Sequence, residues 1–348
     1  MLSKSIQSLQ QMLFSLDGFP DSLAVSAPLL FCGSLALGLG LYVTRRKTKN
    51  DVRGAVILIT GCDSGFGFSL ALHCAQMGME VVAGCFAMGE GREVLEKTEN
   101  VTVVELDVTE DESVLKAVDQ VQHVCGDKGL YCLVNNAATL VFGEATWQTE
   151  EQILNQVHVN MVGPLRMTKA LLPLLAKAKG RVVNMISNCT ECPLPTLSVY
   201  TATKAGLLAL SDGMRPEVKK YGVTIVIVNP GDAPFDTPLT SGQSVNYEKM
   251  EEKMTEEAKK VYGNYFDKCR EKFSTLFPMP PLKKIVEPSY YKTMESVLQA
   301  KSPKAFYENS PLITGMIFGI IKRLPRTMAD VLRLKLMKLP ESNITRND

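Results

Sequence analysis

The sequence has almost no excess of charge of either sign. It contains 38 lysines and arginines against 37 aspartates and glutamates, so its formal net charge is +1. Binding to a nucleic-acid backbone normally needs a surplus of positive charge, and we therefore expect no nucleic-acid partner. With 45% apolar and 22% charged residues, the composition is that of a folded chain rather than a disordered or acidic one.

Ligands for a metal centre are also scarce. The sequence has three histidines, His73, His123 and His158, and one close cysteine pair, Cys189 and Cys192. A structural zinc needs about four such ligands at suitable spacing, so we predict no metal site. The nine cysteines are odd in number and scattered through apolar runs, which indicates buried thiols in a reducing compartment rather than a disulfide framework.

Residues 22–44 contain no charged residue. A helix of this length would be about 34 Å long, enough to cross a hydrocarbon core of about 30 Å. A cleaved signal peptide is the alternative, but such peptides place a basic segment before a shorter apolar stretch, whereas residues 1–21 are mixed and carry one lysine. We therefore predict a single-pass membrane anchor.

The orientation of this anchor follows from the basic residues after it, Arg45, Arg46, Lys47 and Lys49. By the positive-inside rule they place the rest of the chain in the cytosol. Glycosylation sequons occur at Asn100, Asn188 and Asn343, and a lumenal domain would expose them. A glycan on Asn188 would lie beside Ser187, a candidate site residue described below, which also favours the cytosolic side.

An alternation of strands and helices extends from about residue 53 to 240. Continuous apolar runs that read as strands lie at 55–60, 80–83, 101–106, 130–135, 181–186 and 223–228, and segments of helical length separate them. Strands that are apolar on both faces and alternate with helices predict a parallel sheet covered on both sides. The fold class is therefore α/β, a doubly wound Rossmann-type sheet forming a single domain.

A glycine-rich turn follows the first predicted strand and reads Thr60-Gly-Cys-Asp-Ser-Gly-Phe-Gly67. Glycines allow a tight turn and close approach to a pyrophosphate, whose charge then lies at the positive end of the next helix. The position between a strand and a helix is the context that such a motif requires. A dinucleotide is the expected ligand.

Further along the chain, Ser187 precedes the segment Tyr200-Thr-Ala-Thr-Lys204. Tyr200 and Lys204 are four residues apart and share one helical face. An ammonium beside a phenol favours the phenolate and should lower its pKa, usually about 10. Tyr200 is therefore a candidate general acid and base near neutral pH. Ser187, Tyr200 or Lys204 taken alone could have a purely structural role. The prediction of a catalytic site rests on their occurrence together at these spacings.

These motifs together resemble those of the short-chain dehydrogenases and reductases. TGCDSGFG, the Asn135-Asn-Ala-Ala138 element, a serine 13 residues before YTATK, and Asn229-Pro-Gly231 stand in the family's order over residues 53–240. With the strand end AGCF, the chain looks most like the membrane-associated retinol and hydroxysteroid dehydrogenase branch, and insect ecdysteroid-pathway members are possible relatives. The resemblance implies an oxidoreductase that acts on an alcohol or carbonyl group of a lipophilic molecule, either a steroid such as an ecdysteroid precursor or a retinoid. It also implies the endoplasmic reticulum membrane and a possible homodimer.

The resemblance also assigns roles to residues. Tyr200 would transfer the proton, Lys204 would hold the nicotinamide ribose, Ser187 would bind the substrate oxygen, and Asn160 would position a water in the proton relay. The implied cofactor-binding residues are Thr60, Gly61, Asp63, Ser64, Gly65, Phe66, Gly67, Asp107, Val108, Asn135, Ala137, Tyr200, Lys204, Pro230 and Gly231.

The choice between NAD and NADP depends on the charge near the second strand. The strand ends in Gly84-Cys85-Phe86, without the acid typical of NAD sites or the arginine typical of NADP sites. Asp63 in the glycine turn would repel a 2′-phosphate, which favours NAD.

Some positions depart from the family pattern. Ala138 replaces a usual glycine, and the residues after Gly231 differ, with Thr237 displaced by two positions. These departures leave open a second class of function, a catalytically weak membrane scaffold that binds a nucleotide through the same fold.

Two regions follow the predicted domain. Residues 241–308 are a predicted substrate lid, and within them Met250, Met254, Val261 and Tyr265 fall near one face of a helix that could equally be an ordinary amphipathic surface helix. Residues 309–348 begin with 13 uncharged residues, too short to span a membrane, followed by basic residues among leucines. They predict either a buried helix or a helix lying at a membrane surface.

Overall fold

The computed structural model describes residues 49–231, 237–276, 278–279 and 282–341, so the predicted anchor at 22–44 lies outside the described residues. The chain divides into two units, Met1–Asn50 with Ala300–Ser302, and Asp51–Gln299 with Pro303–Asp348. The second unit contains every element discussed below. None of the described helices is both long and apolar enough to cross a membrane.

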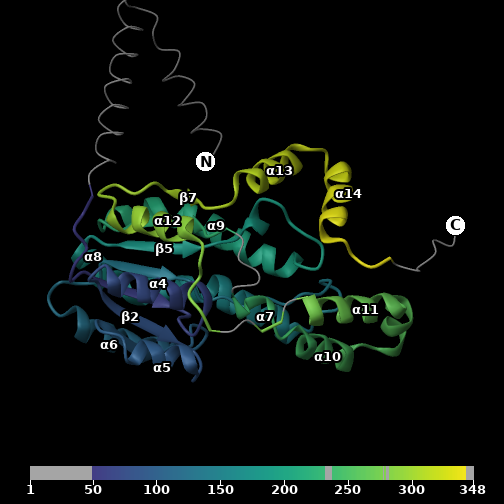
Figure 1. Ribbon diagram of the computed structural model, residues 1–348, viewed down its shortest axis with the longest axis horizontal. Helices are drawn as coiled ribbons and strands as arrows, with labels where there is room; N and C mark the ends of the chain where they lie inside the picture. The colour runs from purple at the N-terminus through teal and green to yellow at the C-terminus, as the bar shows by residue number, and fades with distance from the viewer. Residues whose placement is uncertain (1–48, 232–236, 277, 280–281, 342–348) are drawn as a thin grey trace, which may run out of the picture. The chain divides into compact units, whose positions relative to one another are not determined.

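A seven-stranded parallel sheet forms the centre of the second unit, in the order β3-β2-β1-β4-β5-β6-β7 (Figure 1). The strands are β1 (Val56–Thr60), β2 (Glu80–Cys85), β3 (Val101–Glu105), β4 (Cys132–Asn135), β5 (Arg181–Met185), β6 (Thr224–Asn229) and β7 (Phe306–Glu308). The strand order reverses between β1 and β4. In open α/β sheets, ligands bind outside the carboxyl ends of the strands at this reversal, which locates the expected site.

Helices cover both faces of the sheet. Their bounds are α4 (Gly65–Gln76), α5 (Glu90–Glu96), α6 (Asp111–Cys125), α7 (Glu150–Val157), α8 (Gly163–Ala178), α9 (Ser198–Lys219), α10 (Gln243–Lys253), α11 (Glu256–Leu276), α12 (Pro288–Gln299), α13 (Leu312–Arg323) and α14 (Arg326–Met337). Side chains of α4 and α12 pack on one face of the sheet, and side chains of α6 and α8 pack on the other. The Rossmann-type prediction is confirmed.

The alternation of side chains along β1 explains why its sequence is continuously apolar. Ile57 and Ile59 belong to the core beneath α4 and α12, whereas Val56 and Leu58 belong to the core beneath α6 and α8. All four are almost fully buried. A strand covered on both faces has no polar side to show, so its residues do not alternate between apolar and polar.

The sheet extends beyond the predicted boundary at residue 240. β7 pairs in parallel with β6, and α12 packs on the sheet through Tyr290 and Met294. Residues 241–308 therefore contain part of the sheet layer. The three-residue strand β7 was not predicted because its backbone pairing with β6 is a long-range contact that leaves little local pattern.

The α10–α11 region shares a core with Trp147, the loop after β4 and the start of α9, and Tyr247, Met250 and Phe266 are buried in it; it is called the α10–α11 core. The expected single amphipathic face is only partly correct, because Val261 is 63% exposed. The backbone of α11 is kinked at Gly263, whose positive φ of 51° breaks the helical register. Seven described cysteines are buried free thiols, as expected: Cys62, Cys74, Cys85, Cys125, Cys132, Cys192 and Cys269.

Candidate active site

The glycine turn after β1 leaves no room for larger side chains. Gly61 has a φ of +68°, and a Cβ there would lie 2.8 Å from the Cα of Ala137. A Cβ on Gly67 would lie 2.1 Å from the carbonyl oxygen of Gly61. The turn and the start of α4 therefore pack backbone against backbone, which keeps the first turn of α4 close to the carboxyl ends of β1 and β4.

The first turn of α4 is suited to an anion. Ser64 precedes the helix but makes no capping hydrogen bond through its side chain, and the first turn contains no acidic residue. The N–H groups of this turn therefore meet neither a capping side chain nor a carboxylate, and they coincide with the positive end of the helix dipole. A hollow of about 370 Å³ lies beside them, lined by Gly61, Asp63, Ser64, Phe66 and the loop after β4 among others. These residues fit the pyrophosphate of a dinucleotide.

Asp63 connects the glycine turn to the end of β2. Its carboxylate accepts hydrogen bonds from the backbone N–H groups of Phe86, at 3.1 Å, and Ala87, at 2.8 Å. The negative charge therefore lies at the carboxyl end of β2, where an adenosine ribose binds in folds of this kind. Arg92, on α5, is paired with Glu96 at 2.9 Å.

Asp107 and Val108 follow β3 at the same edge of the sheet. The Asp107 carboxylate accepts from the backbone N–H and the hydroxyl of Thr109, at 2.8 and 2.7 Å. The backbone carbonyl of Val108 accepts from Arg166 at 2.6 Å. These bonds hold the loop, but neither residue lines the hollow described above. Their predicted contact with the cofactor stays a prediction.

The loop after β4 is joined to the glycine turn by Thr60. Its hydroxyl accepts from the backbone N–H groups of Asn136, at 3.0 Å, and Ala137, at 2.9 Å. The side chain of Asn136 donates back to the carbonyl oxygens of Thr60 and Gly61, at 2.9 and 3.0 Å. Asn136 lines the hollow, although sequence reasoning named its neighbours instead. Asn135 lies inside the sheet layer, where it donates to Asn184 at 2.8 Å.

Asn160 lies on a π-helical segment, His158–Val162, which joins α7 to α8 without a break. Its side chain donates to the carbonyl of Thr139, at 2.8 Å, and to the hydroxyl of Thr203, at 3.0 Å, and accepts from the Thr139 N–H at 2.8 Å. Asn160 thus connects the loop after β4 with the helix that carries Tyr200. Short π-helical segments are frequent at functional sites.

Ser187, Tyr200 and Lys204 come together in one cavity, as the sequence predicts. The Tyr200 phenol is hydrogen-bonded to the Ser187 side chain, and Ser187 also accepts from the backbone N–H of Cys189 at 3.3 Å. The Lys204 ammonium donates to the carbonyl of Met185 at 3.0 Å and lies 5.9 Å from the centroid of the Tyr200 ring. The serine is therefore placed by the end of β5, and the other two by α9.

The pKa shifts differ from the expectation for the pair. Burial raises the pKa of Tyr200 above its usual value, and the nearby Cys189 thiol adds to this, while the bond from Ser187 opposes it. Burial lowers the pKa of Lys204 to about 8. The prediction that Lys204 lowers the phenol pKa is thus not met in this geometry, because loss of solvent disfavours both charged forms. Near neutral pH the tyrosine is a phenol that can donate its proton.

The cavity that holds these residues has a volume of about 360 Å³. Its wall is mostly apolar and includes Leu140, Phe142, Leu194, Leu197, Leu239, Phe273, Leu276, Leu336 and Met337. The polar residues of the lining are fewer and include Ser187, Tyr200 and Lys204. An apolar pocket with a few convergent polar groups is typical of a site for a lipophilic small molecule.

Pro230 and Gly231 follow β6 and line the same cavity, as does Thr237. A Cβ on Gly65, in the glycine turn, would lie 2.7 Å from the Thr237 hydroxyl oxygen. The displaced threonine therefore still reaches the start of α4. The methyl group of Ala138, where the family pattern has glycine, lines both this cavity and the hollow beside the glycine turn.

A buried polar cluster behind Ser187 escaped the sequence reasoning. The Asn229 side chain donates to the carbonyl oxygen of the Asn188 side chain, at 2.5 Å, and to Glu308, at 2.9 Å. The Ser310 hydroxyl donates to the same oxygen of Asn188. The cluster joins the turn after β5 to β6 and β7; Asn229 was recognised in the sequence as part of a family motif, and Asn188 only as a sequon. Asn188 is 5% exposed, so a glycan cannot attach to it in the folded chain.

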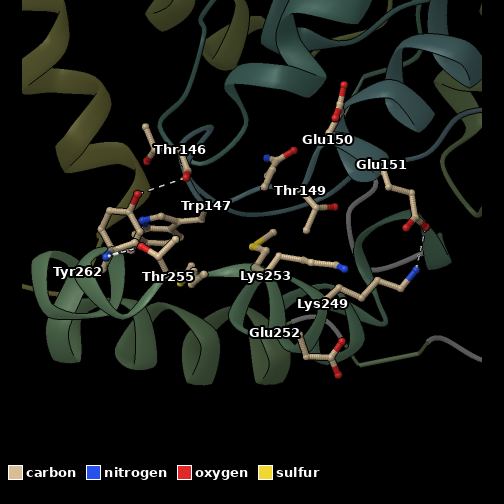
Figure 2. Close-up of a pocket in the computed structure, with 14 residues that line it drawn as sticks. Thr146, Trp147, Thr149, Glu150, Glu151, Lys249, Glu252, Lys253, Thr255 and Tyr262 are labelled. Atoms are coloured by element: carbon tan, nitrogen blue, oxygen red, sulfur yellow. Dashed lines mark hydrogen bonds and ion pairs between the residues drawn. The ribbon is translucent and has the colours of Figure 1, made fainter.

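A second hollow, of about 620 Å³, lies between the start of α7 and the helices α10 and α11 (Figure 2). Its lining mixes acids and lysines, including the pair of Glu151 and Lys249 at 3.3 Å. The hydroxyl of Tyr262 donates to the carbonyl of Thr146 at 3.3 Å. None of the predicted catalytic or cofactor-binding residues lines this hollow. Ser187, Tyr200 and Lys204 line the cavity described above and not this hollow.

The fold and the site together define an α/β oxidoreductase that binds a dinucleotide. The profile of the short chain dehydrogenases matches residues 55–247, and the chain belongs to this family. The resemblance drawn from its motifs is thereby confirmed. The protein is an enzyme of the kind that acts on CH–OH groups, and its family binds a nicotinamide cofactor.

Named relatives place the chain in the retinol and hydroxysteroid branch. It is 40% identical to the mitochondrial D-beta-hydroxybutyrate dehydrogenase of Rattus norvegicus over 64% of this chain and 68% of the relative. It is 35% identical to retinol dehydrogenase 7 of Mus musculus, over 65% and 71%. It is 34% identical to estradiol 17-beta-dehydrogenase 2 of Mus musculus, over 80% and 74%.

Among solved structures, a short chain dehydrogenase from Burkholderia cenocepacia in complex with NADP is similar, with a TM-score of 0.58 and 22% identity over 82% of this chain and 99% of that chain. At this identity the likeness shows the fold alone.

The packing of the glycine turn generates a prediction for Gly67→Ala. The added methyl group cannot fit against the Gly61 carbonyl oxygen, so the first turn of α4 must shift, and we expect dinucleotide affinity to fall at least about tenfold. Titration with the reduced dinucleotide, followed by fluorescence, measures the change. Gly213→Ala is the matched control, since nothing lies within 4 Å of its Cβ position. An unchanged affinity in Gly67→Ala would contradict the packing argument.

The depressed pKa of Lys204 generates a second prediction, for Lys204→Met. Between the folded pKa of about 8 and the usual 10.5, the unfolded chain holds a proton that the folded chain has lost, so the stability of the wild type rises with pH in this window. Measured by urea unfolding, the advantage of Lys204→Met over wild type should shrink by about 2 kcal/mol from pH 6.5 to pH 9.5.

Lys116→Met, on the exposed side of α6, controls for the removal of a lysine. Shared changes in cysteines and tyrosines cancel in the difference between variant and wild type. A difference that stays constant with pH would show that the Lys204 ammonium is not destabilised by burial.

Proposed function

We propose that the protein is an NAD(H)-dependent oxidoreductase that interconverts a hydroxyl and a carbonyl group on a lipophilic molecule of the steroid or retinoid type. The observation that carries this proposal is a mostly apolar cavity of about 360 Å³ whose lining includes the hydrogen-bonded side chains of Ser187 and Tyr200. Pockets of roughly 300 to 1,000 Å³ take small-molecule ligands.

The cavity wall favours a lipophilic substrate over a small acid. The relatives are named for hydroxybutyrate, retinol and estradiol, of which the first is a small carboxylate. Among the described residues of the wall the only cations are Lys204 and Lys272, and both donate to backbone carbonyls. A carboxylate would have to compete for these donors, whereas an apolar skeleton finds leucine and phenylalanine side chains along the wall.

The residues that hold the cofactor in this proposal surround the glycine turn. The N–H groups of the first turn of α4 bind the pyrophosphate, and Lys204 holds the nicotinamide ribose beside Tyr200. The bound nicotinamide ring supplies or accepts the hydride. The protein contributes the position of the substrate oxygen and the transfer of a proton to or from that oxygen.

Tyr200 and Ser187 carry out the acid–base part of the proposed reaction. For reduction, Ser187 donates a hydrogen bond to the substrate carbonyl oxygen, and the neutral Tyr200 phenol donates its proton to the oxygen as negative charge develops there. For oxidation the same tyrosine must act as a phenolate, a form that burial of the phenol disfavours in this structure. Asn160, through Thr203, holds the first turn of α9 in place, and its water-positioning role remains part of the proposal.

The preference for NAD rests on Asp63. Its carboxylate lies at the end of β2, where it would face the 2′-phosphate of NADP, and the nearby Arg92 is paired with Glu96. A like charge at this place raises the free energy of NADP binding relative to NAD.

The membrane location in this proposal is supported by the sequence of residues 22–44 and by the basic residues that follow. A single-pass anchor in the endoplasmic reticulum membrane with the catalytic domain in the cytosol would place the cavity where lipophilic substrates partition. The scaffold alternative is not favoured, since Ser187, Tyr200 and Lys204 share one cavity and the relatives are dehydrogenases.

The role of Tyr200 is tested by Tyr200→Phe. Loss of the hydroxyl removes the proton donor, so we expect kcat to fall by about 10²- to 10⁴-fold while the affinity for NADH stays near wild type. The assay measures turnover of NAD with a panel of steroids, retinols and hydroxybutyrate. Tyr247→Phe is the matched control, because its hydroxyl is buried in the α10–α11 core without a hydrogen-bond partner among the described residues. Undiminished turnover in Tyr200→Phe would end the assignment.

Cofactor choice is tested by Asp63→Asn, which keeps the size of the side chain and removes its charge. We expect the ratio of NADP affinity to NAD affinity to rise about tenfold, equivalent to ~1.4 kcal/mol. Glu90→Gln removes another acid close in sequence to the end of β2, from the exposed first turn of α5, and should leave the ratio unchanged. A wild type that prefers NADP, or a ratio that Asp63→Asn leaves unaltered, would refute the electrostatic argument.

A further inference from the structure

Helices α13 and α14 expose an unusual concentration of apolar side chains. Among the described residues, ten of the 22 exposed large apolar side chains lie between residues 312 and 337. They are Leu312, Ile313, Met316, Ile317 and Ile320 on α13, and Met328, Val331, Leu332, Leu334 and Leu336 on α14. Monomeric soluble proteins rarely expose contiguous apolar patches of more than a few hundred Å², and larger ones mark partner or membrane surfaces.

The exposure follows the helical period, which argues for a built surface. On α13 the exposed residues recur one, four, five and eight positions after Leu312, so they form one stripe. The opposite side of α13 is packed, since Ile321 is 2% exposed against Cys192 and Ala329. α13 therefore already has a packed face, and the exposed stripe is a second apolar face that the described residues leave uncovered. The exposed apolar side chains of α13 and α14 together are called the α13–α14 surface.

The charges around the α13–α14 surface have one sign. Residues 309–340 contain six basic residues, Lys322, Arg323, Arg326, Arg333, Lys335 and Lys338, against the single acid Asp330. The rest of the chain balances this excess, because the whole sequence has a net charge of only +1. An apolar stripe bordered by lysine and arginine matches a bilayer with acidic headgroups, in which the apolar side chains enter the acyl boundary and the cations meet phosphate and carboxylate groups.

The same surface is continuous with the substrate cavity. Leu336 and Met337, at the end of α14, line the cavity that contains Ser187 and Tyr200. The Lys272 ammonium donates to the carbonyl oxygens of Met337, at 2.8 Å, and Lys338, which holds the end of α14 against α11. Leu336 is 44% exposed and so belongs to both the outer surface and the cavity wall. In Figure 1, α13 and α14 follow β7 and lie to one side of the sheet.

We propose that the α13–α14 surface docks on an anionic phospholipid bilayer, and that the end of α14 places the mouth of the substrate cavity at that bilayer. This inference rests on the proposed function for the identity of the cargo, a lipophilic alcohol or carbonyl compound that enters from the lipid. The docking itself is independent of turnover.

The test uses the full chain in vesicles of phosphatidylcholine and phosphatidylserine that contain brominated acyl chains, which quench tryptophan on contact. The natural chain has one tryptophan, Trp147, which is 3% exposed in the α10–α11 core and serves as an unquenched baseline. Ile313→Trp adds a reporter on α13 at a position that is 73% exposed. We expect brominated lipid to lower the added emission at least about twofold, as for a side chain buried at the acyl boundary.

Leu115→Trp is the matched control, because Leu115 is a 61% exposed apolar residue on α6, which lies away from α13 and α14 in Figure 1. Its emission should not respond to bromine. Adding Arg326→Glu and Lys335→Glu to the Ile313→Trp protein should weaken the quenching in these vesicles. The Ile313→Trp protein without these two charge changes should be quenched less in vesicles of phosphatidylcholine alone than in vesicles that contain phosphatidylserine.

The outcomes separate docking from catalysis. An unquenched Ile313→Trp in a protein that turns over lipophilic alcohols would overturn the docking and leave the proposed function in place. An unquenched reporter with blue-shifted emission would also overturn it and would assign the surface to a second copy of the chain. Quenching without turnover of any steroid or retinol would support the docking and remove the proposed function.

Discussion

The burial of the Lys204 ammonium is the constraint on which the site depends. Placing this charge at the end of β5 lowers the lysine pKa to about 8, and a single backbone carbonyl, that of Met185, accepts its proton at 3.0 Å. Removing an ammonium group from water raises its free energy unless hydrogen-bond partners replace the water, so the rest of the fold must offset the cost of burying Lys204.

The elements around the pair are arranged to keep that geometry. Asn160 joins the loop after β4 to Thr203 on α9, and Asn229 joins the turn after Ser187 to β7. The same carboxyl edge of the sheet carries the glycine turn, where Gly61 and Gly67 pack backbone against backbone. The glycine turn and the cavity of Ser187 and Tyr200 therefore lie near the reversal of strand order between β1 and β4, the general location for ligands in open α/β sheets.

Much of this could be predicted from local pattern. The first six strands, the glycine turn and the shared helix of Tyr200 and Lys204 were all predicted, because each depends on short-range periodicity or on spacing along one helix. The direction of the Tyr200 pKa shift was not, since it depends on how much solvent the whole fold removes from the phenol. Asn136, Asn188 and Glu308 were missed because their hydrogen bonds join segments that are distant in sequence.

By itself, the sequence determined the class of fold, the place of the glycine turn and the pairing of Tyr200 and Lys204 on one helix. These follow from backbone conformations and side-chain spacings that neighbouring residues decide. Only the tertiary structure decided that β7 completes the sheet, that the end of α14 forms part of the cavity wall, and that one face of α13 is left exposed. Those features depend on which surfaces meet when distant segments pack, and burial is a property of the assembled chain rather than of any one segment.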